Sequence, residues 1–250
     1  MDERMKSTVA ACVLLALAAA PRAGIAQTLD DIVARHVAAR GGSEKLQAIQ
    51  TIKMTRTVAN GIGAPLRVIV YKKRPNLMRL EQGPATPGAS MIPRGMNGDT
   101  AWDIVQGTPA TRPPQLAAEA RDTDGDFDGL LVDWREKGHT IAFEGREALP
   151  GGDAYKLKVT LKSGLVRTVF VDAKTYLERR HTGVLNLPGN RQFDVTIAFD
   201  NWRAVDGVMF PFDITEERTG KEPVVTLVTY TEKIEINLPM DDALFAPPSK

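Results

Sequence analysis

The sequence predicts a mainly β protein that is built on an antiparallel sheet and has a few helices. Three observations support this fold class: apolar and polar residues alternate over most of the chain, turn dipeptides separate the alternating runs, and helical periodicity is confined to short stretches. Alternation with a period of two is typical of strands that bury one face and leave the other in water, as antiparallel sheets do. From the spacing of these runs we expect about ten to twelve strands.

Residues 1–26 have the pattern of a secretory signal peptide. Arg4 and Lys6 precede an apolar run at residues 9–20, and small residues follow at the positions that a signal peptidase reads. The run is shorter than the roughly 20 residues that span a bilayer, so we expect cleavage rather than a retained anchor. The expected mature chain, residues 27–250, is a single exported domain.

Charge and cysteine content exclude several classes of function. The chain has 32 Lys+Arg and 31 Asp+Glu, and loss of residues 1–26 would leave it without net charge. Because a nucleic-acid binder carries a basic excess or stripe, we expect no nucleic-acid partner. The single cysteine, Cys12, lies in the expected signal peptide. The mature chain is therefore expected to have neither disulfides nor cysteine-bound metals.

The first helix is predicted at residues 29–40. One face at helical spacing carries four apolar residues and a histidine, namely Leu29, Ile32, Val33, His36 and Val37. Thr28 suits the N-cap, and Gly41 with Gly42 suits the stop. A short second helical turn is expected at residues 43–49.

Strands are expected from Thr51 onward. The clearest alternating runs lie at residues 66–71, 155–162 and 192–199. Turn signals stand between the runs, at Asn60-Gly61, Asn97-Gly98, Ser163-Gly164, Gly189-Asn190 and Asp206-Gly207. So large a sheet must close, curl or pair with a second sheet, and its apolar face must be covered.

Residues 115–137 interrupt the strand pattern. Residues 116–120 and 127–137 are predicted to form two short helices around an acidic turn, and they are expected to cover the sheet together with the first helix. Residues 84–95 are rich in Pro, Gly and Ala, which predicts a long loop. Because no repeat or linker divides the chain, we expect one domain.

Catalytic motifs are scarce. None of the serines in the expected mature chain lies in Gly-x-Ser-x-Gly, and the histidines form no His-x-x-x-His pair. His36 lies on the apolar face of a predicted helix and is expected to be packed. His139 and His181 flank strands and are expected at the surface. We therefore do not expect an enzyme, although a nucleophile and a base far apart in sequence could still meet in space.

An acidic stretch resembles the opening of a calcium-binding loop. Asp124, Asp126 and Asp128 alternate and are followed by Gly129 at the sharp-turn position. The twelfth position, which needs a bidentate acid, holds Arg135. The other interpretation is a helix N-terminus, where aspartates cap amide groups. We therefore predict no metal site, and keep the three aspartates only as candidates for calcium.

Two segments are specific enough to carry a family resemblance. Residues 68–79 read VIVYKKRPNLMR, and residues 97–102 read NGDTAW. They resemble the strand–KRPN–strand and DG-x-T-x-W segments of the Lol-type periplasmic lipoprotein carriers. The closing residues 243–248 resemble the carriers' Phe-x-x-Pro segment. Residues 129–139 look like the wider group of outer-membrane lipoprotein-sorting-like proteins.

The resemblance implies an incomplete, strongly curved antiparallel barrel with helices over its open side. The apolar space between them would receive acyl chains of a lipid or lipoprotein in the periplasm, with no cofactor and with a membrane protein as delivery partner. Arg74, followed by Pro75, would bond lid backbone and hold the cavity shut. Met78 stands where the carriers have an aromatic that touches cargo. With Trp102 of the second motif, these are the candidate ligand-binding or latch residues.

Two other functions stay open. The same curved-sheet fold occurs in envelope-stress regulators that bind partner proteins, so a sensor module is the alternative to a carrier. A periplasmic hydrolase is the third reading, and it would need histidine or carboxylate groups that converge in the cavity with shifted pKa values.

Overall fold

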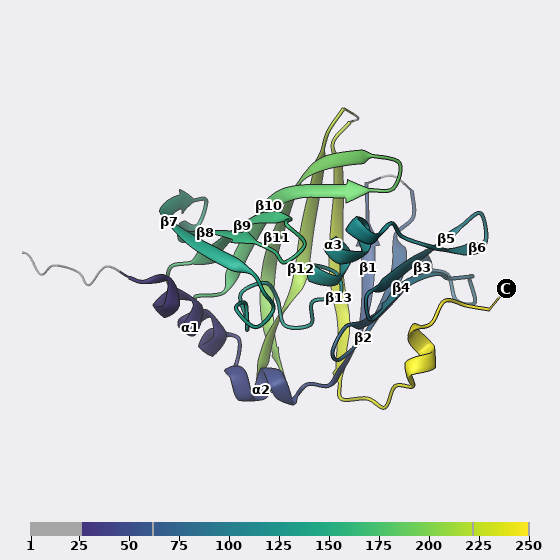
Figure 1. The fold of residues 1–250 in the computed structure, drawn as a ribbon, viewed down its shortest axis with the longest axis horizontal. Coiled ribbons are helices and arrows are strands. Elements are labelled where there is room, and N and C mark those ends of the chain that lie inside the picture. The colour runs from purple at the N-terminus through teal and green to yellow at the C-terminus, as the bar shows by residue number, and fades with distance from the viewer. Residues whose placement is uncertain (1–26, 62, 222, 250) are drawn as a thin grey trace, which may run out of the picture.

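All strands of the described chain belong to one antiparallel sheet (Figure 1). The structure is a computed structural model that describes residues 27–61, 63–221 and 223–249. The expected signal peptide, residues 1–26, lies outside the described residues. In chain order the strands are β1 (Thr51–Ala59), β2 (Leu66–Lys73), β3 (Leu77–Pro84), β4 (Ile92–Asn97), β5 (Thr100–Val105), β6 (Thr108–Thr111), β7 (Thr140–Leu149), β8 (Gly152–Thr160), β9 (Val166–Asp172), β10 (Glu178–Leu187), β11 (Arg191–Val205), β12 (Val208–Thr219) and β13 (Val225–Ile236).

The strand order makes the sheet an incomplete barrel. From edge to edge it runs β6-β5-β4-β3-β2-β1-β13-β12-β11-β10-β9-β8-β7. Consecutive strands pair throughout except β6 and β7, which form the two edges. The first and last strands meet in the middle, where Ile52 of β1 lies opposite Ile236 of β13. The sheet curves around an inner face that helices and loops cover (Figure 1). The predicted fold class, a curved and incomplete antiparallel barrel, is confirmed.

The sheet has thirteen strands, one more than the upper end of the expected range. β4 begins at Ile92, inside the loop predicted at residues 84–95. β6 has only four residues, Thr-Pro-Ala-Thr, and they do not alternate between apolar and polar.

The helices are α1 (Leu29–Ala39), α2 (Ser43–Ala48) and α3 (Pro114–Asp122), with a 3-10 turn, η1 (Asp242–Phe245), near the C-terminus. Thr28 caps α1 as predicted, since its Oγ1 accepts the N–H of Asp31 at 3.2 Å and the Asp31 carboxylate accepts the N–H of Thr28 at 3.3 Å. Gly41 follows α1 at a φ of 120°, and a Cβ there would lie 2.4 Å from the carbonyl oxygen of Gly207. The close approach of these two turns therefore requires glycine. No helix in the described residues is both long and apolar enough to cross a membrane.

Residues 127–137 do not form the helix that the sequence predicts. They belong to a series of turns and bends between α3 and β7, which we call the plug (residues 123–139). Gly129 has a φ of 96° and Asp133 a φ of 49°, and such left-handed residues interrupt a right-handed helix. The prediction of a helix here was wrong because apolar spacing does not reveal these two breaks.

The apolar side chains of the plug complete the core on the inner face of the sheet. Leu130, Leu131 and Val132 are 7%, 1% and 1% exposed. Val132 packs with residues of α2, β1, β2, β12 and β13. Leu130 and Leu131 pack with residues of α1, β8 and β9. The three side chains therefore link two of the apolar clusters of the core.

The C-terminal segment covers the outer face of β3, β4 and β5. Phe245 of η1 is fully buried, and its carbonyl oxygen accepts the indole N–H of Trp102 at 3.1 Å. Trp102 lies opposite Gly95 in the sheet, where a Cβ would come within 2.8 Å of the indole ring. The glycine makes room for the tryptophan on this face.

Candidate functional site: the plug and its latch

Arg74, directly after β2, is bonded to both α2 and the plug. Its Nη1 and Nη2 donate to the two carboxylate oxygens of Asp128 at 2.8 and 2.7 Å. Its Nε donates to the carbonyl oxygen of Ile49 at 2.7 Å, and Nη2 also donates to that of Leu46 at 2.9 Å. The side chain of Asp128 is only 6% exposed. A bidentate arginine–carboxylate pair with so little exposure to solvent is a strong, directional contact. We call this pair of side chains, Arg74 and Asp128, the latch.

Three further cations bond the polar part of the plug. Arg40, at the end of α1, donates to the carbonyl oxygen of Asp128 at 3.2 Å. Lys72 of β2 donates to the carbonyl oxygen of Asp126 at 2.6 Å. Lys137 donates to the Asp126 carboxylate at 2.5 Å. Burial lowers the pKa of both Arg40 and Lys72, and nearby carboxylates oppose that effect, Glu178 foremost at Arg40 and Asp126 at Lys72. Lys137 belongs to the plug itself, whereas Arg40, Lys72 and Arg74 hold the plug from other parts of the fold.

The plug therefore combines two kinds of contact with opposite chemistry. Residues 126–129 are tied by hydrogen bonds and ion pairs to α1, β2 and the chain after β2. The next three residues, 130–132, are apolar and buried against the inner face of the sheet. The plug can leave the inner face of the sheet only if other apolar groups replace its apolar contacts. Water or other charged groups must also replace its polar contacts.

A polar cleft of about 430 Å³ adjoins the latch. Arg74, Pro75 and Asn76 line one part of it, and charged residues of the plug, among them Asp133 and Glu136, line another. Because its walls are mostly charged, this cleft suits water and ions rather than an acyl chain.

The structure brings together some of the predicted site residues and separates others. Arg74 and Pro75 both lie at the latch. Met78 is 4% exposed and packs on the inner face with Met96 and residues of α3. Trp102 lies on the outer face beneath Phe245. The segments around Trp102 and Phe245, which both carried the family resemblance, meet there, away from the latch.

Two of the three aspartates that resemble a calcium loop have cationic protein partners. Asp128 is paired with Arg74 and Asp126 with Lys137, while Asp124 is exposed. Within the part of the chain that the structure describes, no group of three or more His, Cys, Asp or Glu residues could hold a metal ion.

The three histidines differ in their surroundings. His36 is 1% exposed, as expected, and its Nδ1 lies 2.9 Å from the carbonyl oxygen of Tyr176. Burial lowers its pKa to about 4. The prediction that His139 lies at the surface was wrong, because His139 ends the plug and is buried, where its Nδ1 accepts the N–H of Lys162 at 3.1 Å. His181 was also expected at the surface, but its side chain is 14% exposed and contacts Glu178.

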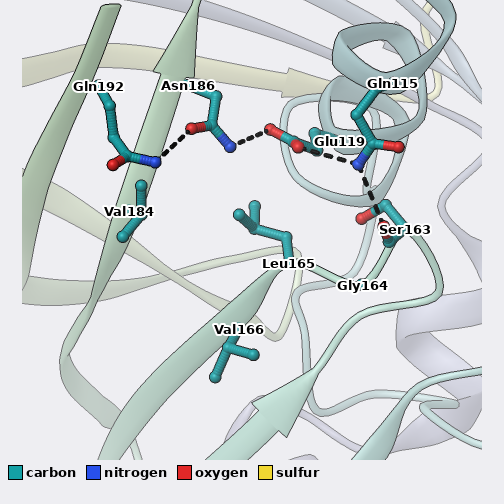
Figure 2. Close-up of a pocket in the computed structure, with 9 residues that line it drawn as sticks. All are labelled: Gln115, Glu119, Ser163, Gly164, Leu165, Val166, Val184, Asn186 and Gln192. Atoms are coloured by element: carbon teal, nitrogen blue, oxygen red, sulfur yellow. Dashed lines mark hydrogen bonds between the residues drawn. The ribbon is translucent and has the colours of Figure 1, made fainter.

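A second cleft, of about 360 Å³, lies between α3 and the ends of β9 and β10 (Figure 2). Glu119 of α3 accepts hydrogen bonds from Gln115 at 3.0 Å and from Asn186 at 2.9 Å. Gln192 extends this chain by donating to Asn186 at 3.0 Å. On the other side of the cleft are the apolar side chains Leu165, Val166 and Val184. Its polar groups come from α3, β10 and β11, so no local sequence signal predicts it.

Sequence reasoning missed the partners of Arg74. The acidic motif at residues 124–129 was visible, but the cations that bind it lie 54 or more residues earlier in the chain at Arg74, Lys72 and Arg40. Only the folded sheet brings these side chains to the plug.

Comparison with known proteins identifies the fold. No family model matches the chain, and no curated protein matches its sequence. A LolA superfamily protein from Nitrosomonas europaea is similar in structure at 15% identity, with a TM-score of 0.58, over 86% of this chain and 96% of that one. A DUF1329 family protein from Desulfovibrio piger is similar at 14% identity, with a TM-score of 0.57, over 87% of this chain and 96% of that one.

A domain named for outer membrane lipoprotein sorting, from Vibrio parahaemolyticus, is similar at 12% identity, with a TM-score of 0.53, over 86% of this chain and 94% of that one. These identities are low, so the likeness concerns the path of the chain rather than any particular ligand. In each case nearly the whole of the other chain is matched. With its open, curved sheet and covered inner face, the chain has the LolA-like fold.

Proposed function

We propose that the protein is a periplasmic carrier that binds acyl chains of a lipid or lipoprotein on the inner face of its sheet. The observation that supports this most directly is the plug, in which buried Leu130, Leu131 and Val132 occupy the centre of that face. The LolA-like fold supports it as well. A ligand would take the place of these three side chains, and a membrane protein would receive the ligand on delivery.

The energies of exchange are of the right size for reversible binding. Burial of an alkyl chain contributes about 0.8 kcal/mol per CH₂, or roughly 12 kcal/mol for 16 carbons. Binding must displace three buried apolar residues of the plug, which costs about 1.5–3 kcal/mol for each. It must also open the latch between Arg74 and Asp128. The plug and latch therefore oppose the ligand, and closure would favour release.

The proposed activity needs no catalytic group. His36 and His139 are buried and already hydrogen-bonded, which disfavours a role for either as a general base. The residues of the plug instead act as a two-state element, with a closed form that the latch stabilises and an open form that the ligand stabilises.

Native mass spectrometry of the mature chain, incubated with phospholipids and acylated peptides, tests the proposal. We expect mass increments that correspond to acyl-bearing molecules. Arg74→Leu should retain more ligand after dilution than the wild type, because its closed form is weakened. Arg67→Leu, an exposed arginine on β2, is the matched control and should release ligand like the wild type. An unchanged mass with every lipid, together with a stable complex with a membrane-protein domain, would favour the sensor module instead.

A further inference from the structure

Arg56 of β1 is a half-buried cation with a fully buried Nε, and it has no anionic partner among the described residues. It lies on the inner face, in the same row as the core residues Ile52 and Met54. In the described chain its Nε is buried without a hydrogen-bond acceptor, and its Nη2 donates only to the sulfur of Met54 at 3.0 Å. Sulfur is a weak acceptor. Burial lowers the pKa of Arg56 to about 10, and an unpaired buried charge destabilises a fold.

Two other arginines of the inner face are satisfied, whereas Arg94 of β4 shares with Arg56 a buried Nε that has no hydrogen-bond acceptor in the described residues. Arg218 of β12 forms an ion pair with Glu216. Arg167 of β9 donates to the carbonyl oxygen of Val184 at 2.7 Å. Arg56 has neither an ion pair nor an oxygen acceptor among the described residues.

The residue opposite Arg56 is a second unsatisfied polar group. Thr231 of β13 pairs with Arg56 across the sheet and is 7% exposed. Its Oγ1 is buried and, in the described residues, has no hydrogen-bond partner. The register between β1 and β13 shifts between Thr55 and Arg56, and such bulges re-aim side chains and are frequent next to functional sites. A guanidinium and a hydroxyl therefore stand together on an apolar face with unused hydrogen-bonding capacity.

The plug binds a second cation of the same region. Lys72 of β2 donates to the carbonyl oxygen of Asp126 in the plug at 2.6 Å. Arg56 is close enough to contribute to the lowering of the Lys72 pKa, after the larger effect of burial. Movement of the plug would leave Lys72 without that acceptor. Two cations and a hydroxyl would then border the apolar surface of Val68 and Val70, which are buried in β2.

We propose that Arg56 and Thr231, joined by Lys72 when the plug moves, bind the anionic head group of an amphiphile whose alkyl chain replaces the plug. The recognised chemistry is an oxyanion, either carboxylate or phosphate, because a guanidinium pairs with both through two parallel hydrogen bonds. This inference rests on the proposed function and narrows it to anionic lipids. The ligand would satisfy the buried charge, whereas a neutral lipid would leave it unpaired.

Calorimetric titration with matched twelve-carbon ligands below their micelle-forming concentrations tests the inference. The probes are dodecanoate, dodecyl phosphate, dodecan-1-ol and inorganic phosphate. We expect the wild type to bind at least one of the two anionic chains about tenfold to a hundredfold more tightly than the alcohol, as hydrogen bonds to a charged group require. Arg56→Met should bind all three chains with the affinity of the alcohol. Thr231→Val should lose a smaller part of the preference.

Arg67→Met, on the neighbouring strand with its side chain exposed, is the matched control and should keep the preference of the wild type. Arg56→Met should also melt at a higher temperature than the wild type without ligand, because an unpaired buried charge is removed. This second readout shows that the variant is folded.

The outcomes distinguish failure of the head-group site from failure of the carrier function. If the alcohol and the anionic chains bind equally well, or if Arg56→Met keeps the preference, the head-group site is wrong while the carrier function stands. If inorganic phosphate alone binds as tightly as dodecyl phosphate, the site takes a free ion and the assignment to a lipid is overturned. If no chain binds at all, the carrier function fails with it.

Discussion

The guanidinium of Arg74 and the carboxylate of Asp128 form a two-bond ion pair, at 2.7 and 2.8 Å, across 54 positions of sequence. Arg74 follows a strand and Asp128 lies in the plug, so the pair fixes the plug to the sheet. Leu46 and Ile49 of the α2 region also accept from the same guanidinium. One side chain thus joins three separate parts of the fold, and its removal should affect all three.

Arg74→Leu is expected to lower the free energy of unfolding by about 2–3 kcal/mol, since it leaves the Asp128 carboxylate buried without its cation. Urea denaturation of the unliganded protein measures this. The double variant Arg74→Leu/Asp128→Leu should lose less free energy of unfolding than the two single variants lose together. The reason is that the second change removes the carboxylate that the first leaves without a cation. Additive losses would show that the two side chains do not depend on each other.

Trp102→Phe is expected to lower the free energy of unfolding by about 1–2 kcal/mol and to leave acyl-chain capture unchanged. The substitution removes the indole N–H that the carbonyl oxygen of Phe245 accepts, and that oxygen then stays buried without its donor. Thermal unfolding and native mass spectrometry of the same variant check the two parts. A changed amount of bound lipid at unchanged stability would contradict the placement of Trp102 away from the ligand.

Because His36 is buried in its neutral form, we expect the protein to lose stability in mild acid. Its pKa is lowered from 6.5 to about 4 by burial, so between these values the unfolded chain binds a proton that the folded chain does not. The stability from neutral His36 is present above pH 6.5 and falls as the pH drops towards 4, by about 3 kcal/mol in all. Urea unfolding at a series of pH values measures the slope.

His36→Gln is the control for this slope. A glutamine can still donate to the carbonyl oxygen of Tyr176, which lies 2.9 Å from Nδ1 of His36, but it does not titrate. Between pH 6.5 and about 4 the free energy of unfolding of this variant should change less than that of the wild type. An equal slope in both proteins would assign the acid sensitivity to other groups.

Much of the fold could be predicted because strands and caps have local signals. The alternation of apolar and polar residues around Val68 and Leu157 indicates strands with one buried face. Thr28 followed by Asp31 indicates the start of a helix. The plug could not be predicted in the same way. Its apolar residues have helical spacing, but left-handed turns at Gly129 and Asp133 send them into the sheet.

The candidate site was predictable only in part for a related reason. Arg74 was identified by its motif, whereas Asp128 was considered as a calcium ligand because its neighbours are acidic. Its actual cation comes from the end of a distant strand. Arg56 carried no signal either, since an arginine in an alternating strand is expected on the wet face and here lies on the inner face. The contacts of both residues join segments that are far apart in the sequence, and composition and spacing do not reveal such contacts.

The plug itself can be tested with a matched pair of core residues. Leu131 of the plug and Leu157 of β8 belong to the same apolar cluster and are 1% and 0% exposed. Replacing either with alanine should lower the free energy of unfolding by about 2–5 kcal/mol. Their effects on ligand binding should differ. Leu131→Ala weakens only the closed form, because the ligand displaces this side chain, and so it should tighten acyl-chain binding.

Leu157→Ala removes a side chain from the sheet, against which both the plug and the ligand would pack. It should therefore destabilise the protein without raising its affinity for dodecanoate, measured by calorimetric titration. A gain in affinity for Leu131→Ala alone identifies the plug as the element that competes with the ligand. Equal affinity changes in the two variants would mean that the plug stays in place when the ligand binds, and the exchange of plug for acyl chain would then be wrong.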